Sequence, residues 1–115
     1  MKKEVVSYSG FSMMPHARVE LLDNNKGLVI INGEEQVVDI PDYKILSFWD
    51  RIEQLGVWNW KKKYNPKYEI LDGYQWVLQL RNRTGNAKHI EGCNSYPKNF
   101  KDFMKELNFL FGSKI

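Results

Sequence analysis

The chain has 115 residues, 43% of them hydrophobic and 14% aromatic, and a formal net charge of +3. This length predicts one domain, because a second would be too small to bury its own core. The 4 Trp, 6 Tyr and 6 Phe side chains exclude a disordered chain, and a charge of +3 does not by itself indicate a nucleic-acid-binding protein.

The single cysteine, Cys93, excludes an internal disulfide and any zinc site built from several thiolates. The two lysines near the start are not followed by an apolar run, and no window approaches the length of a membrane-spanning segment. We therefore expect a cytoplasmic protein without a signal peptide and without a membrane partner.

The first third of the chain predicts an antiparallel meander, because alternating or β-branched apolar runs are separated by turn residues. The predicted strands are 4–9, 17–23, 28–31 and 36–40. Residues 10–16 form a loop, and residues 24–27 and the Asn32-Gly33 pair form tight turns. Residues 28–31 are apolar toward both faces of the predicted sheet.

Pro41 opens a predicted helix that runs to about Leu55 and ends at Gly56. Its apolar stripe comprises Ile45, Phe48, Ile52 and Leu55. The side chains of Tyr43, Leu46 and Trp49 widen this stripe beyond what packing on a sheet usually needs.

The second half of the chain predicts a hairpin followed by another helix. Trp76, Leu78 and Leu80 alternate with polar residues in one strand, and residues 87–91 form the return strand. Gly92 indicates a bulge or a close backbone approach.

The last helix is predicted to begin at Pro97 and to end at Gly112. Its stripe comprises Phe100, Phe103, Met104, Leu107, Leu110 and Phe111, while Phe109 falls on the opposite face. Each helix follows a hairpin, so the chain reads as two ββα units plus N-terminal strands. The predicted fold class is α+β: an antiparallel β-sheet of 5–6 strands with two helices packed on one face.

Three short motifs follow one another along the second half of the chain, and each occurs once. They are Trp60-x3-Tyr64, Asp72-Gly73-Tyr74-Gln75-Trp76, and Gly92-x-Asn94-x-Tyr96-Pro97-x2-Phe100. This pattern resembles a family of small bacterial domains known mainly as hypothetical proteins, over roughly residues 55–111. No activity follows from the resemblance, because that family has no assigned function.

We interpret the motif residues mainly as scaffold, with a binding or catalytic role as the alternative. Asp72 and Gly73 are expected to form a tight entry into the strand, and Trp76 to anchor the core. Asn94 is expected to bond free amides at the start of the last helix. Tyr96 and Phe100 flank that start in the manner of a hydrophobic staple.

Catalytic signatures are weak in this sequence. His89 lies four residues before Cys93, which is about 13 Å along an ideal strand and too far for a nucleophile and its base. His16 is the other imidazole and lies on a different hairpin, and pairs such as Asp72 with Tyr74 or Glu91 occur in every small domain. We therefore expect a protein that is not an enzyme and has no metal or cofactor.

Residues 57–68 combine aromatic and basic side chains without an acidic one, which is the composition of a single-strand nucleic-acid site. The candidate contacts are Trp58, Lys61, Lys62, Lys63, Tyr64 and Lys67. Alternatively, the tryptophans pack inward from a strand-like segment, and the lysines are solvated beside the end of the first helix.

Protein association is the preferred interpretation, as an interaction or accessory role with a protein partner or a second copy. The candidate surface comprises Tyr43, Leu46, Trp49 and Phe109, together with the sheet face that the helices leave bare. Alternatively, the N-terminal strand and the loop with Met13 and Met14 cover that face. Weak single-strand nucleic-acid binding through residues 58–68 is the second hypothesis.

Overall fold

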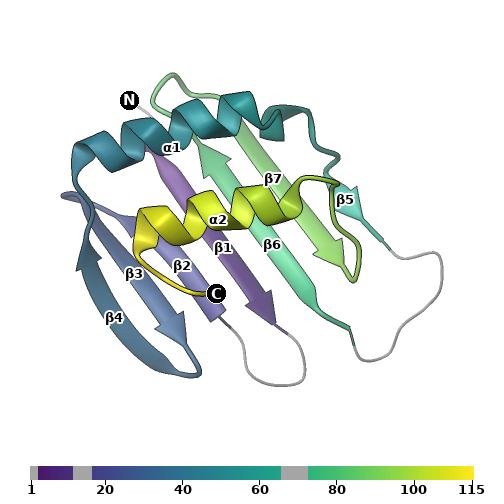
Figure 1. Ribbon diagram of the computed structural model, residues 1–115, viewed down its shortest axis with the longest axis horizontal. Helices are drawn as coiled ribbons and strands as arrows, with labels where there is room; N and C mark the ends of the chain where they lie inside the picture. Colours follow the sequence, from purple (N-terminus) through teal and green to yellow (C-terminus); the bar gives the residue numbers. More distant parts are fainter. Residues whose placement is uncertain (1–2, 12–16, 66–72) are drawn as a thin grey trace.

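A seven-stranded sheet carries two helices on one of its faces, which makes the fold α+β (Figure 1). The computed structural model describes residues 3–11, 17–65 and 73–115. Five residues named above lie outside the described part: Met13, Met14, His16, Lys67 and Asp72.

Both predicted helices and all six predicted strands are present in the predicted order. The strands are β1 (Val5–Phe11), β2 (Ala17–Leu22), β3 (Lys26–Ile31), β4 (Glu34–Asp39), β5 (Lys63–Tyr64), β6 (Gln75–Arg81) and β7 (Ala87–Cys93). The helices are α1 (Asp42–Gln54) and α2 (Phe100–Phe111), and a short 3-10 helix, η1 (Val57–Asn59), follows α1.

The strand order in the sheet is β4-β3-β2-β1-β6-β7-β5. All neighbours are antiparallel except β5, which pairs parallel with β7 through Lys63–Glu91 and Tyr64–Gly92. The expectation of five or six antiparallel strands therefore missed this seventh strand. A two-residue strand has too few positions for alternation to appear in the sequence.

The two hairpins, β3–β4 and β6–β7, lie on either side of β1 and β2 in the sheet, and both helices run across the sheet (Figure 1). The β3–β4 turn has positive φ at both Asn32 (54°) and Gly33 (81°), as a two-residue type I′ hairpin requires. The predicted turn at this position is confirmed.

Helix α1 begins after Pro41, and Gly56 follows it in the left-handed region with φ 68°. Helix α2 begins at Phe100, three residues later than predicted, because residues 97–99 form a turn in which the Phe100 N–H donates to the Pro97 carbonyl. The Asn99 amide does not cap α2: it donates to the Leu55 carbonyl (2.6 Å) and accepts from Trp60 Nε1 (3.0 Å).

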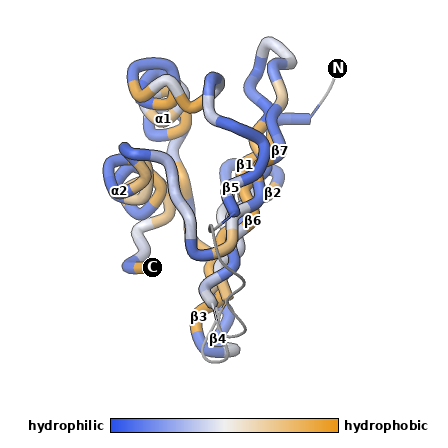
Figure 2. The backbone as a smooth tube through the Cα atoms, turned by 90° about the vertical axis from the view of Figure 1, so that its right-hand side faces the viewer, coloured by the Kyte–Doolittle hydropathy of each residue, from blue (hydrophilic) through white to orange (hydrophobic). Residues whose placement is uncertain are grey.

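The core lies between the sheet and the helix layer (Figure 2). Its largest fully buried side chains are Trp76 and Tyr8 from the sheet and Phe103 and Phe111 from α2. Phe48 of α1 meets Phe103 edge-on, with ring centroids 6.4 Å apart. Aromatic rings from the sheet, α1 and α2 therefore all contribute to the core.

Gly92 marks a close approach rather than a bulge, since the β6–β7 register continues unbroken through the Trp76–Gly92 pair. A Cβ at Gly92 would lie 2.1 Å from the indole nitrogen of Trp76. Only glycine leaves room for this ring beneath β7.

Candidate functional site

The helix residues proposed as an interaction surface do not form one patch. Tyr43, Leu46 and Phe109 are 67%, 46% and 59% exposed. Lys44 lies over the Phe109 ring, 4.8 Å from its centroid, on the flank of α1 that faces α2. Leu46 lies about 160° around the helix from Lys44, so Phe109 and Leu46 flank α1 on opposite sides.

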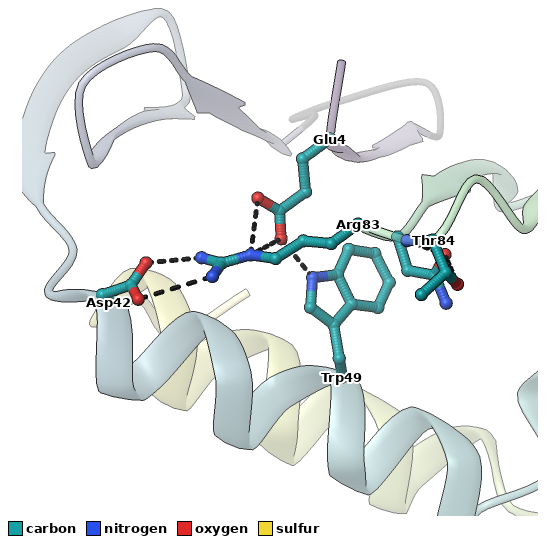
Figure 3. Close-up of polar contacts among 6 residues, drawn as sticks. Glu4, Asp42, Trp49, Arg83 and Thr84 are labelled. Atoms are coloured by element: carbon teal, nitrogen blue, oxygen red, sulfur yellow. Dashed lines mark hydrogen bonds and ion pairs between the residues drawn. The ribbon is translucent and has the colours of Figure 1, made fainter. Parts of the chain in front are cut away.

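The fourth residue proposed for that surface, Trp49, does not belong to it. Trp49 is only 8% exposed and is part of the core. Its ring stacks on Trp58 with centroids 6.1 Å apart and an interplanar angle of 15°. Its indole N–H donates to the Glu4 carboxylate (Figure 3). The widening of the apolar stripe at Trp49 therefore reflects contact with η1 and with Glu4, the residue before β1.

Arg83, in the β6–β7 turn, joins three distant parts of the chain. Its guanidinium donates to Glu4 before β1 and to Asp42 in the first turn of α1 (Figure 3). The hydrogen bond from Arg83 holds the pKa of Asp42 below its usual range. The same bond to Asp42 raises the pKa of Arg83. This network ties the β6–β7 turn to the helix layer.

The motif residue Asn94 bonds to Tyr74, directly before β6, and not to the start of α2. The side-chain Oδ1 of Asn94 accepts from the Tyr74 backbone N–H (2.7 Å), and the backbone N–H of Asn94 donates to the Tyr74 carbonyl (2.8 Å). Asn94 has φ 49°, a left-handed conformation that asparagine tolerates. Gly73 leaves room for this amide, because a Cβ there would lie 2.4 Å from Asn94 Nδ2. The expected helix-capping role of Asn94 was wrong.

Trp76 is the centre of an aromatic stack. Its ring lies nearly parallel to Tyr96 (6.3 Å, 9°) and also stacks on Tyr64 (6.0 Å, 29°). Its indole N–H donates to the Ser95 carbonyl (3.1 Å). Tyr96 and Phe100 are in contact with centroids 4.9 Å apart, which agrees with the staple-like contact predicted across Pro97.

The Tyr74 hydroxyl meets the Tyr8 hydroxyl at 2.6 Å inside this cluster. Burial, and then the bond to Tyr74, raise the pKa of Tyr8, and burial raises that of Tyr96. The Tyr8 and Tyr96 hydroxyls therefore keep their protons at neutral pH, and neither of these two groups provides a base for catalysis. These contacts support the scaffold interpretation of the motif.

The aromatic side chains of residues 57–68 that the structure describes face inward. Trp60 is buried, whereas Trp58 and Tyr64 are partly buried against the core. Lys61, Lys62 and Lys63 are exposed. The prediction that the tryptophans pack inward is confirmed, although Trp58 does so from a 3-10 turn rather than a strand.

A groove with a volume of about 990 Å³ lies beside this segment at the β7 end of the sheet. Its lining residues are Val5, Trp58, Lys62, Lys63, Gln79, Leu80, Arg81, Asn86, Ala87, Lys88, His89 and Glu91. Sequence reasoning found Trp58, Lys62 and Lys63. It missed Arg81 and Lys88, because only strand pairing brings them to the same groove.

The face of the sheet away from the helices carries apolar side chains at its β3–β4 end. Val29 is buried toward the helices, so Leu28 and Ile30 project from the other face. Val37 pairs with Leu28, lies on the same face and is 60% exposed. The prediction that residues 28–31 are apolar toward both faces is confirmed.

Among the described residues, no group of three or more His, Cys, Asp or Glu side chains is placed to hold a metal ion. Within the same part of the chain, neither helix has the length and apolarity needed to cross a bilayer. No protein-family model, curated protein or solved structure matches the chain.

Proposed function

We propose that this protein is a non-enzymatic binding module that acts by contact with another protein through the sheet face opposite the helices. The observation that carries the proposal is the apolar group of Leu28, Ile30 and Val37 on that face. An antiparallel sheet with one solvated face normally places polar side chains there. Val37 is exposed and Leu28 and Ile30 are partly exposed, and accessible apolar groups of this kind mark contact surfaces.

The surroundings of this patch match the polar rim of a protein interface. Lys26 forms an ion pair with Asp39 on one side, and Arg18 pairs with Glu20 at 2.9 Å on the other. Both pairs are internally neutral, whereas Glu35, which pairs with Ile30 in the sheet, adds a negative charge on the same face.

The aromatic contacts argue against the alternative, single-strand nucleic-acid binding through residues 58–68. Such binding needs rings that are open to bases, whereas Trp58 stacks on Trp49 and Tyr64 stacks on Trp76. The lysines alone would provide an electrostatic contact that salt weakens.

Site-specific photo-crosslinking tests the proposal. With a photo-reactive amino acid in place of Val37, illumination of cells that contain the protein should give one defined protein adduct. The adduct mass identifies a second copy or a different protein. In this background Leu28→Gln should reduce the adduct yield several-fold, because it removes apolar contact area beside position 37.

The matched control places the photo-reactive residue at Lys101, which is exposed on α2. Equal adducts from positions 37 and 101, or no adduct from position 37, would overturn the proposal. Circular dichroism on each variant separates loss of contact from loss of folding.

A further inference from the structure

We infer that the outer edge of β7 binds an extended, acidic segment of a partner protein. This site lies at the opposite end of the sheet from the apolar patch. It therefore goes beyond the proposed function and stands or falls separately from it.

The first argument is charge. Lys62, Lys63, Arg81 and Lys88 line the groove, and Glu91 is the one acidic side chain among its described lining residues. Glu91 already contacts His89, with Oε1 3.1 Å from Nε2. A groove with this excess of cations concentrates anionic ligands.

The second argument is a pair of unused donors. Trp58 Nε1 and Arg81 Nε are buried, and neither has a hydrogen-bond partner among the described residues. Both side chains line the groove. A buried N–H without an acceptor is costly and rare in native proteins. Both nitrogens are covered in this structure, so an oxygen atom of an acidic ligand accepts from them only if neighbouring side chains shift.

The third argument is the strand edge. Within the described chain, β5 pairs with only Glu91 and Gly92 of β7, and the Glu91 N–H donates to the Lys62 carbonyl at 2.9 Å. Backbone groups alternate in direction along a strand, so those of His89 and Ala87 point outward as Glu91 does. An extended peptide can pair with these groups as an added strand.

Together these features favour a peptide over a nucleic acid. The neighbouring rings stack on one another or on the core and offer no open platform for bases. The outward N–H and C=O groups of β7 instead match a peptide backbone, and the surrounding lysines match carboxylates.

The test measures binding of a fluorescent peptide of alternating Glu and Thr, about ten residues long and thus able to span a strand. Fluorescence anisotropy is read at about 50 mM salt, where electrostatic attraction is strong. The same assay uses a Lys-Thr peptide of equal length and a single-stranded oligothymidylate. We expect the Glu-Thr peptide to bind most tightly.

The first variant removes charge from the groove. Lys62→Gln combined with Lys63→Gln should raise the Kd of the Glu-Thr peptide about tenfold. The matched control, Lys61→Gln with Lys98→Gln, removes the same charge from exposed positions outside the lining and should change the Kd less than about twofold.

The second variant tests strand pairing. His89→Pro removes an N–H that points outward, so it leaves the β6–β7 bonds in place. It should raise the Kd about tenfold, whereas His89→Ala should have little effect.

Absence of peptide binding at low salt overturns the inference, as does an equal loss in both lysine double variants. Tighter binding of the oligothymidylate, unaffected by His89→Pro, would assign the groove to nucleic acid instead. The lysine variants keep the test valid if His89→Pro does not fold.

Discussion

Trp49 and Tyr43 lie on the same helix and illustrate how burial decides the role of an aromatic residue. Trp49 contacts Trp58 and Glu4 and is 8% exposed, whereas Tyr43 is 67% exposed. The sequence places both beside the apolar stripe of α1. Their different surroundings separate a core residue from a surface residue.

We expect Trp49→Ala to lower the free energy of unfolding by about 3–5 kcal/mol, because it leaves a large cavity and removes the partner of Glu4. Tyr43→Ala, the matched control, should change it by less than about 0.5 kcal/mol. Urea denaturation of both variants measures the difference. A small loss for Trp49→Ala would return this residue to the list of contact residues.

At the scale of elements, the Glu4–Arg83–Asp42 network links the first turn of α1 to the end of the sheet (Figure 3). Asp42 also lies in the first turn of α1, where a negative charge is favourable. The two effects act on the same carboxylate, and both require its ionised form.

The pKa of Asp42 is lowered in the folded protein, so its stabilising effect is present above the ordinary carboxyl pKa of about 4. This effect is lost as the pH falls through the lowered folded-state value. We expect Asp42→Asn to lower the melting temperature at pH 7, and the difference from the wild type to shrink at acid pH.

Asp50→Asn is the control, since Asp50 is exposed on the same helix and forms no ion pair within the described chain. Thermal melts of the three proteins across the acid range measure both effects. A difference for Asp42→Asn that does not depend on pH would contradict the ionic role of Asp42.

At the scale of the whole molecule, the sheet has two chemically different edges. The β4 edge carries Glu34, Glu35 and Asp39, whereas lysines surround the β7 edge. Antiparallel pairing of two β4 strands about Val37 would place Glu35 opposite Asp39, and like charges in opposed positions are destabilising. Charge therefore protects β4 against self-pairing.

Amide exchange should reveal this edge directly. The Ile40 N–H donates to the Asn25 carbonyl on the β3 side, and alternation then directs the N–H groups of Gln36 and Val38 to β3 and those of Glu35 and Val37 outward. We expect fast exchange at Glu35 and Val37 and slow exchange at Gln36 and Val38, as measured by NMR.

The amides of β1, which pairs on both sides, serve as the protected reference. Protection of Glu35 and Val37 that disappears on dilution would mean that a second copy adds a strand to β4. That result would contradict the protective role of its charges.

The sequence by itself determined the local elements, because each of them depends on residues that are neighbours along the chain. Examples are the Asn32-Gly33 turn, the prolines and glycines around the helices, and the alternation in β6. These signals predicted both helices, six of the seven strands and the burial of Trp76. The tertiary structure decided the strand order, the parallel strand β5, the burial of Trp49 and the partner of Asn94. It also brought Lys62 and Lys63 beside Arg81 and Lys88. Local patterns do not specify contacts between segments distant in sequence, because such contacts depend on how the whole sheet and helix layer pack together.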